Sequence, residues 1–480
     1  MSRETIYIVW RDLYMLSEII NVQTERHIQE PALDLLWNSQ YSVMNVLNCM
    51  PGDIWEMLDD ADSEEVRLKR PVLPSDWERP LIYTHCVRHF KYEPSDRHPD
   101  TAAFYEMLRM CLPPGPLFPN IKSLLWETSD AATLPHFRAF IGPRVTSLAV
   151  STLQSASHLS LLPSLVTECP LLRDVSILTS KGLLGRCEAA EAVSFLVKQL
   201  THLESLEVPC LDAAALEHVA KCPALEDLYL TDQTPLPLVE HLEVGSPTCR
   251  DITQINLTVT DVRAATEVLI RFHASPISNL HIQYPRTTSA AALQEIYKGV
   301  AAHGNHASLT CLSIAVPHAK HPDAAAADAE QIADAEQIAL YTVPGTHLSP
   351  LFAFTKLTYL ALAGVVGLDL EDAAAADIAR ARPSITSLDL AGSAFPHIPP
   401  RTTLRALLAF ARFCPRLWRL CLPIDARTVP EWSQTDAEVR PAQRYLESLH
   451  VGESPVGTPL DVAAYVSGIF PKLEWVSAGR

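Results

Sequence analysis

A short pattern recurs along this chain: an aliphatic residue, two variable residues and a second aliphatic residue, as in LEDL and ISNL. Successive copies mostly lie 22 to 32 residues apart, with one longer step of 48 residues between Leu312 and Leu360. A period of this size, with a strand-like core followed by a helical run, is typical of leucine-rich repeats. The second aliphatic residues of the thirteen copies are Leu124, Leu148, Val175, Leu206, Leu228, Ile255, Leu280, Leu312, Leu360, Leu388, Leu420, Leu449 and Val476.

A proline stands two residues before the first aliphatic residue in seven of these copies. Proline lacks a backbone donor and disfavours helix at the residue before it, so each proline is predicted to end a helix and begin a strand. Cys169, Cys222 and Cys414 precede three of the prolines. Phe118 and Phe470 take the same place in two other copies, which indicates a packing position and not a reactive thiol. The seven prolines are Pro119, Pro143, Pro170, Pro223, Pro383, Pro415 and Pro471.

Amphipathic helical patterns such as EAVSFLVKQL and LRALLAFARF separate the strand patterns. Repeated strand, helix and parallel strand predict an α/β fold: a right-handed leucine-rich-repeat solenoid, or horseshoe, with its parallel sheet on the concave face. The repeat pattern is absent before residue 116, so residues 1–115 are predicted to form a small helical module that caps the solenoid domain of residues 116–480. An acidic, alanine-rich insertion is expected at about residues 318–342, where DAEQIA occurs twice in succession.

Composition narrows the classes of partner and compartment. The net charge of −18 argues against nucleic acid and anionic membranes as partners, because both require concentrated Lys and Arg. The chain shows no pattern of a signal peptide or membrane span, so a cytoplasmic or nuclear location is expected. Its eleven cysteines include no C-x-x-C pair and are expected to remain thiols.

Two segments near the N-terminus carry a more specific signal. EPALDLLWNSQYSVMNVLNCMPGDIW at 30–55 and LKRPVLPSDWERPLIYTHCVRHF at 68–90 resemble the region just after the F-box in fungal F-box-like leucine-rich-repeat proteins. In that family the F-box helices dock a Skp-family adaptor of a cullin ubiquitin ligase, so the resemblance implies such an adaptor as a partner. The Leu-Pro opening of an F-box does not occur here, so the N-terminal half of the F-box is missing or divergent. Residues 4–20 are instead predicted to fold back as a helix against residues 31–50 and to form a cap for the first repeat, without a competent adaptor-binding surface.

Candidate chemical motifs do not assemble into a site by spacing. His85 and Cys86 lie in an apolar run that offers no third, orienting group. DDADSEE at 59–65 lacks the Gly and Glu of a calcium loop, and the chain has no phosphate-binding glycine loop. The histidines around a later strand have no partners at zinc spacing; they are His303, His306, His318 and His321. We therefore expect no catalytic residues, no metal and no cofactor.

The outward-facing strand residues form the candidate site, because side chains alternate between the two faces of a strand. Three neighbouring strands present a polar, hydrogen-bonding patch, whereas earlier and later strands are interpreted as presenting mostly Ser, Ala and Pro. The nine predicted partner-binding residues are Asp227, Tyr229, Thr231, Gln254, Asn256, Thr258, Asn279, His281 and Gln283.

These observations favour a protein–protein interaction role without enzymatic activity. The leading hypothesis is an F-box-like substrate receptor whose repeats bind a protein target for a cullin-type ubiquitin ligase. The alternative is a leucine-rich-repeat scaffold or inhibitor with no ubiquitin connection. A third possibility, a hydrolase, requires a nucleophile and a base gathered on the concave face.

Overall fold

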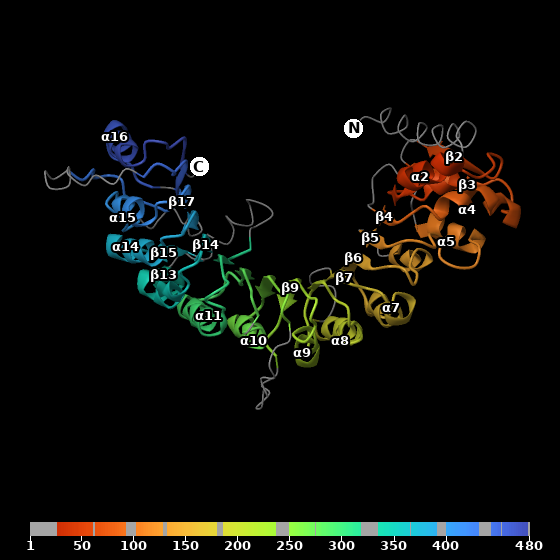
Figure 1. Cartoon of the computed structure of the whole chain (residues 1–480), viewed down its shortest axis with the longest axis horizontal. Helices are drawn as coiled ribbons and strands as arrows, with labels where there is room; N and C mark the ends of the chain where they lie inside the picture. The colour runs from red at the N-terminus through yellow and green to blue at the C-terminus, as the bar shows by residue number, and fades with distance from the viewer. Residues whose placement is uncertain are drawn as a thin grey trace. The chain divides into compact units, whose positions relative to one another are not determined.

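The computed structural model divides the chain into two compact units, Met1–His218 and Val219–Arg480, here called unit 1 and unit 2 (Figure 1). Each unit is described by itself. The described residues are 26–60, 63–92, 102–127, 132–179, 186–236, 249–273, 275–317, 335–364, 366–390, 400–431, 443–452 and 454–478.

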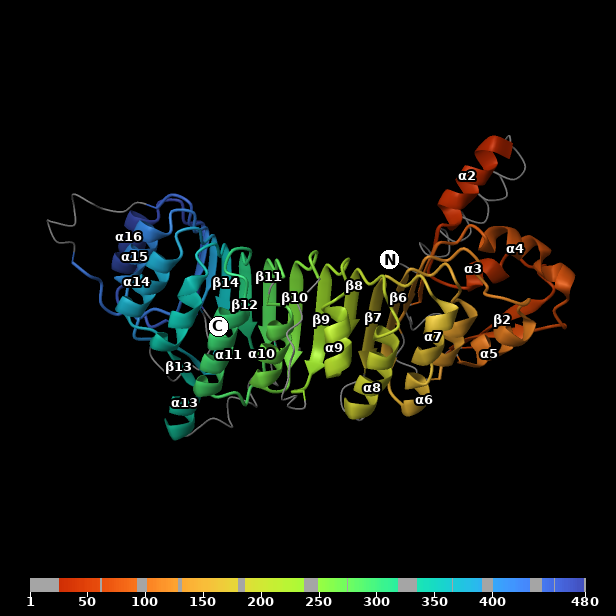
Figure 2. The ribbon, with the colours of Figure 1, turned by 60° about the horizontal axis from the view of Figure 1, so that its bottom comes forward.

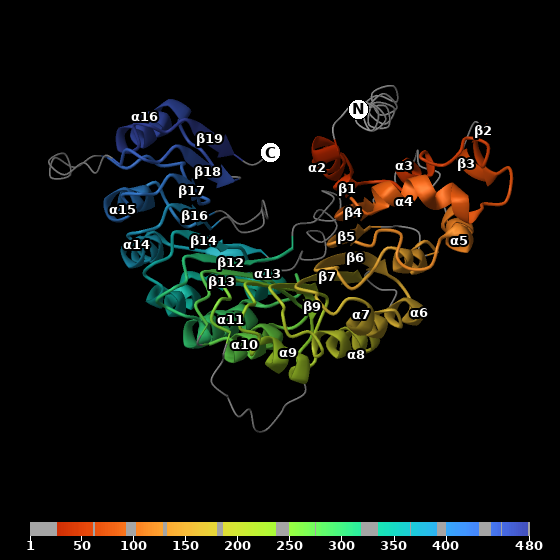
Figure 3. The same cartoon turned by 45° about the vertical axis from the view of Figure 1, so that its right-hand side comes forward.

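Unit 1 contains a parallel sheet whose strands follow the order β1-β4-β5-β6-β7-β8, and Figure 3 shows β4, β5 and β6 as neighbours. A separate antiparallel hairpin joins β2 to β3, with Trp55 opposite Leu68. The strands are β1 (Ser39–Gln40), β2 (Trp55–Asp60), β3 (Ser63–Leu68), β4 (His89–Tyr92), β5 (Ser123–Trp126), β6 (Ser147–Leu153), β7 (Asp174–Thr179) and β8 (Ser205–Val208).

Short helices connect the strands of unit 1, as the apolar periodicity of the sequence predicts. They are α2 (Arg26–Trp37), α3 (Met44–Leu47), η1 (Pro74–Trp77), α4 (Glu78–Thr84), α5 (Ala102–Cys111), η2 (Leu134–Ala139), α6 (Ala156–Leu159), α7 (Leu162–Glu168), α8 (Arg186–Val197) and α9 (Ala213–Val219), which ends at the boundary with unit 2.

Unit 2 contains a parallel sheet with the order β9-β10-β11-β12-β14-β16-β17-β18-β19, and β13 pairs with β15 in a small second sheet. Figure 2 shows β9, β10, β11, β12 and β14 side by side. The strands are β9 (Asp227–Gln233), β10 (Gln254–Val259), β11 (Asn279–Gln283), β12 (Cys311–Ala315), β13 (Thr342–Pro344), β14 (Tyr359–Leu362), β15 (Gly367–Asp369), β16 (Ser387–Asp389), β17 (Arg419–Cys421), β18 (Ser448–Gly452) and β19 (Trp475–Ala478).

The helices of unit 2 lie along one face of its sheet (Figures 1 and 2). Serine and aspartate caps begin two of them: the Ser289 hydroxyl accepts from the Ala292 amide, and the Asp261 carboxylate accepts from the Arg263 amide. The helices are α10 (Val262–Arg271), α11 (Ala290–His303), α13 (Ala335–Tyr341), η3 (Gly345–Ala353), α14 (Asp372–Ala381), α15 (Ala406–Phe413) and α16 (Pro459–Ile469).

The thirteen aliphatic positions that define the sequence pattern align across the strands of each unit. In unit 2, Leu228 pairs with Ile255, which pairs with Leu280, and the alignment continues to Val476. We call this row of cross-strand neighbours the leucine ladder. Apart from Val476, these thirteen residues are at most 2% exposed. Together with the alternating helices, this alignment confirms an α/β solenoid of the leucine-rich-repeat kind.

The ladder of unit 1 begins earlier than the sequence pattern indicates. Phe90 on β4 pairs with Leu124, and Gln40 on β1 pairs with Phe90. A search restricted to aliphatic residues misses both strands, although Val87 and Phe90 are spaced as in the other copies and are buried. Part of the region expected to be only helical thus contributes strands to the sheet.

The cysteine and phenylalanine residues at the helix-to-strand corners are packed as predicted. Cys169 and Cys414 cap the C-terminal ends of α7 and α15, and neither is exposed. Phe470 caps α16 in the same way and is 1% exposed. The recurrent Cys-Pro pairs are therefore part of the core.

Two sequence predictions fall partly or wholly outside the described residues. The predicted helix at 4–20 lies outside them, so its packing stays a prediction. Of the expected insertion at 318–342, residues 335–341 form α13, and Thr342 begins β13. In the part of the chain that the structure describes, no helix is both long and apolar enough to span a membrane.

Candidate functional site

The candidate site is the face of the unit 2 sheet opposite its helices, here called the open face. On β9, Leu228 and Leu230 are buried, whereas Asp227, Tyr229 and Thr231 are half-buried. The same alternation holds on β10 and β11. The nine residues predicted to bind a partner thus all lie on strand positions that face away from the core.

Eight of these nine residues align across strands. Asp227, Gln254 and Asn279 form one row. Tyr229, Asn256 and His281 form a second row, and Thr258 pairs with Gln283. Thr231 lies beside a shift in the pairing of β9 with β10, where its regular alignment ends. Residues that are about 25 positions apart in sequence therefore lie side by side on adjacent strands, whose spacing is about 4.8 Å.

Hydrogen bonds hold part of this patch in place. The Gln254 side-chain amide donates to the Tyr229 hydroxyl at 2.8 Å. The Thr258 hydroxyl donates to the Gln283 carbonyl at 3.4 Å. These groups lie at half-buried or exposed positions that face away from the core. The patch is suited to contacts with the backbone and polar side chains of a partner.

His281 and Cys311 are neighbours on β11 and β12, a pairing that the sequence analysis did not anticipate. The Cys311 sulfur lies 3.8 Å from Nε2 of His281. Burial lowers the pKa of His281 and raises the pKa of the Cys311 thiol, so both favour their neutral forms. A neutral thiol is a poor nucleophile, and this pair does not resemble an activated Cys–His site.

The open face extends beyond the predicted patch. The row that begins at Asp227 continues through Cys311 to Tyr359, Arg419 and finally Trp475. The expectation that later strands present mostly Ser, Ala and Pro is therefore wrong at these four positions. Reading the residue just before each second aliphatic position would have found all four of them.

Tyr359 lies among charged groups on this extension. Burial raises its pKa most strongly, the charge of Asp389 raises it further, and the charge of Arg419 lowers it. Asp389 and Arg419 come from the neighbouring strands β16 and β17. These groups act on one ring because the sheet brings them together.

A hydroxyl–imidazole cluster lies on the last two strands. The Ser448 hydroxyl lies 3.0 Å from Nε2 of His450, and the Ser477 hydroxyl meets Nδ1 of the same ring. In a hydrolytic triad a carboxylate occupies the Nδ1 side and stabilises the imidazolium. A serine hydroxyl has no charge with which to do this, so the cluster is better suited to hydrogen bonding than to hydrolysis.

The other sequence motifs are accounted for by local structure. His85 Nδ1 lies 2.6 Å from the Leu81 carbonyl, and burial raises the pKa of Cys86 to about 11. Residues 59–60 and 63–65 of the acidic run belong to β2 and β3, and Asp59 pairs with Glu64. Nε2 of His306 lies 2.7 Å from the Ala301 carbonyl. The described residues contain no group of three or more metal-ligating side chains, and His318 and His321 lie outside them.

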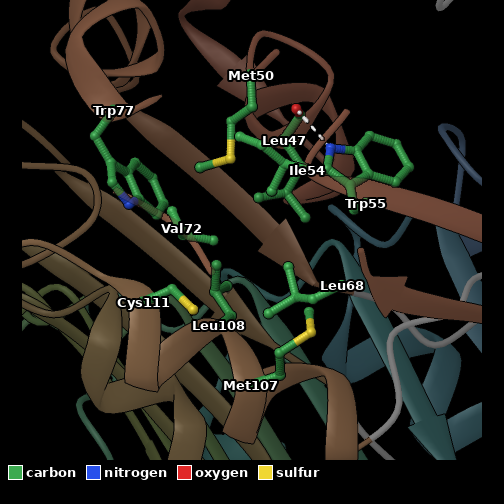
Figure 4. Close-up of a pocket in the computed structure, with 10 residues that line it drawn as sticks. All are labelled: Leu47, Met50, Ile54, Trp55, Leu68, Val72, Trp77, Met107, Leu108 and Cys111. Carbon is green, nitrogen blue, oxygen red and sulfur yellow. Dashed lines mark hydrogen bonds between the residues drawn. The ribbon is translucent and has the colours of Figure 1, made fainter. Parts of the chain in front are cut away.

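Unit 1 contains an apolar pocket between the hairpin, η1 and α5 (Figure 4). Its volume is about 300 Å3, counted with the solvent-open space at its mouth. The indole N–H of Trp55 donates to the Leu47 carbonyl at 3.2 Å. No polar surface lines the pocket, so it offers no chemistry to a reacting group. The lining residues are Leu47, Met50, Ile54, Trp55, Leu68, Val72, Trp77, Met107, Leu108 and Cys111.

Comparison with solved structures finds distant similarity. No family model and no curated protein matches the chain. A chain in the crystal structure of the Rad7 and Elc1 complex in yeast is 14% identical, and the match covers 66% of this chain and 80% of that chain. The TM-score is 0.32, which is too low to support any inference about function.

Proposed function

We propose that this protein binds a protein target through the open face of unit 2. It serves as an F-box-like substrate receptor for a cullin-type ubiquitin ligase, and other subunits carry out ubiquitin transfer. The observation that carries the proposal is the alignment of polar side chains from separate repeats on one solvent-facing sheet surface. Such a surface requires the solenoid, because no single repeat supplies it.

The chemistry of the open face supports a macromolecular partner. Amide, hydroxyl and imidazole groups recur at the strand spacing, so an extended chain can contact several repeats at once. Tyr359, Arg419 and Trp475 belong to the residue types that contribute most to binding energy at protein interfaces. Trp475 is 71% exposed, so its ring is available for contact.

The N-terminal segments support the receptor role. Trp37 of the EPALDLLW segment stacks on Tyr83, with ring centroids 4.7 Å apart. Leu35 on α2 and Ile82 on α4 are 81% and 57% exposed. A docked Skp-family adaptor would cover apolar side chains of this kind.

Target binding is tested by cross-linking mass spectrometry in fungal cells that express this chain. The test variant is Asn256→Arg, which places a long cation at the centre of the patch. The matched control is Ala291→Arg, at an exposed position on α11. We expect discrete protein cross-links to the open face that disappear in Asn256→Arg and persist in Ala291→Arg. Cross-links that are unaffected by Asn256→Arg would refute binding at this face.

Adaptor binding is a separate measurement. Isothermal titration of the full chain with a purified Skp-family adaptor distinguishes the receptor from the scaffold alternative. The receptor role requires a stable complex that Leu35→Asp weakens, whereas an N-terminus without a docking surface gives no complex. If no complex forms while the target cross-links persist, the scaffold alternative replaces the receptor role.

A further inference from the structure

Negatively charged side chains outnumber positively charged ones along the open face of unit 2. Three positions of each repeat border this face: the two residues before the ladder residue and the one after it, here called the face positions. Across the nine strands β9 to β19 of the main sheet, these positions carry five carboxylates and one guanidinium. The guanidinium is Arg419 on β17. The carboxylates are Asp227 and Asp389 on the strands, and Glu226, Glu447 and Glu474 at exposed positions directly before the strands.

Exposed aromatic rings accompany these carboxylates. Tyr359 and Trp475 occupy the same row of face positions and are 37% and 71% exposed. They lie four strands apart in the sheet, or about 19 Å at the usual strand spacing. Along this row, Ser387 separates Tyr359 from Arg419, and Ser448 separates Arg419 from Trp475. Each large side chain is therefore flanked by a small one. Aromatic faces attract Lys and Arg through cation–π contacts.

The corresponding positions of unit 1 have a different balance. They carry the basic residues Arg88, Lys91, Lys122 and Arg173 against the acidic residues Asp174, Glu204 and Glu207. Arg173 forms an ion pair with Glu204 at 2.6 Å. The acidic character therefore belongs to unit 2 and is not a general property of the repeat.

We propose that the partner of the unit 2 open face is an extended protein segment that bears Lys and Arg. This inference rests on the proposed function and specifies the class of partner. The cationic side chains lie near Asp227 on β9 and near Asp389 on β16. Apolar parts of the segment cover the rings of Tyr359 and Trp475. The complementary charge speeds association and excludes acidic segments.

Basic residues near the face limit the position of the segment. Lys356, Arg416 and Lys472 are exposed in the turns that precede the strands. The segment therefore lies over the strands and not over these turns. Arg419 opposes a cation above β17, so its removal should strengthen binding of a basic segment.

The test uses three fluorescein-labelled peptides of about twelve residues, long enough to cross several strands. They share one Gly/Ser/Val frame and carry Lys and Arg, Asp and Glu, or no charged residues. Fluorescence anisotropy measures their binding to the full chain at low and physiological ionic strength. The test variant is Asp227→Asn combined with Asp389→Asn. The control is Glu295→Gln combined with Asp377→Asn, which removes the same charge from α11 and α14.

We expect the wild-type chain to prefer the basic peptide. The open-face variant should lose roughly tenfold in affinity, and the helix variant should lose far less. Arg419→Gln should bind the basic peptide more tightly. Equal losses in the two double variants would indicate general attraction to a chain of net charge −18 and would overturn the proposal.

The remaining outcomes separate the two proposals. If the acidic or neutral peptide binds best and the open-face variant weakens it, the face binds peptides but the assigned charge class is wrong. If the open-face variant changes the binding of none of the three peptides, binding at this face fails together with the charge class. Circular dichroism and thermal unfolding show whether each variant is folded.

Discussion

The open faces of units 1 and 2 are built on one strand pattern but differ in chemistry. In unit 1 the row before the ladder contains Ser123, Ser147 and Ser205, and several face positions are basic. In unit 2 the same row presents Tyr359 and Trp475, and the carboxylates outnumber the cations over all face positions. The buried ladder sets the backbone in both units, and the outward residues are left to vary. A shared fold thus supports two surfaces of different binding character.

The ends of the two sheets also differ. Gln40 begins the ladder of unit 1 and is 4% exposed, and its side chain bonds to the Trp37 carbonyl and the Asn45 side chain. Val476 ends the ladder of unit 2 and is 62% exposed. The last strand of a sheet has a neighbouring strand on one side only, so its apolar side chains are less completely covered. The contribution of a ladder residue to the free energy of unfolding therefore depends strongly on which strand carries it.

The largest expected effect comes from truncating buried ladder residues. Leu148→Ala in unit 1 and Leu388→Ala in unit 2 should each lower the free energy of unfolding by about 2–5 kcal/mol, because each leaves a cavity. Val476→Ala should cost less than about 1 kcal/mol, since its side chain is largely exposed. Urea denaturation combined with limited proteolysis identifies which unit unfolds. A cost at Val476 equal to that at Leu388 would contradict the exposed end of the ladder.

The next effect compares one arginine in each unit. Arg70 in unit 1 bonds to Asp76 at 2.8 Å and to Asp53 at 2.8 Å, and Asp76 accepts from the Leu73 amide. Arg401 in unit 2 contacts Asp369 and Glu371 on the exposed surface. Arg70→Gln should lower the unfolding temperature more than Arg401→Gln, because Asp76 is 7% exposed and loses its counter-ion.

The Arg70 effect should depend on pH. Hydrogen bonds from Arg70 hold the pKa of both Asp53 and Asp76 below the usual range. A carboxyl group with a lowered folded-state pKa contributes stability that is fully present above its unfolded pKa of about 4 and is lost as pH falls through the folded value. The difference between wild type and Arg70→Gln should therefore be largest near neutrality and shrink in acid. A constant difference from pH 7 to pH 3 would contradict this origin.

A smaller effect concerns the cysteines. Burial raises the pKa of Cys169 in unit 1 and Cys414 in unit 2 to about 12, whereas Cys311 is only half-buried on the open face. In the folded chain, iodoacetamide near pH 8 should modify Cys311 well before the two corner cysteines, as measured by peptide mass spectrometry.

Replacing Cys169 and Cys414 by Ala should loosen packing and leave binding at the open face intact. Loss of binding with normal thermal unfolding would instead assign these thiols a functional role.

The smallest expected effect is the change in the stability of unit 2 as His281 titrates. Burial lowers its pKa below 6.5 in the folded chain. The unfolded chain then binds the proton first as pH falls, so unit 2 should lose a little stability from about pH 6.5 down to the folded pKa. His281→Gln should flatten this dependence, whereas Asn256→Gln should not. An imidazole titration by NMR that gives a value above 6.5 would contradict the effect of burial.

The ladder and the helix-to-strand corners could be predicted from sequence because their signals are local. Each repeat carries its own spaced aliphatic pair, and several carry a proline at the corner. The strands β1 and β4 escaped prediction because Gln40 and Phe90 are not aliphatic. Gln40 is tolerated in the core because its carbonyl accepts from the Asn45 side chain at 2.6 Å. That contact depends on how the module packs.

The sequence by itself determined which residues face the core and which face outward, because strand alternation depends only on spacing along the chain. Only the tertiary structure decided which outward residues meet. Asp389 and Arg419 both act on Tyr359, yet they lie 30 and 60 residues away along the chain. Arg382 is likewise 2% exposed because it donates to the Leu351 carbonyl and lies over the Phe352 ring. Such contacts between distant residues arise when whole repeats align side by side. No single stretch of the sequence encodes that alignment.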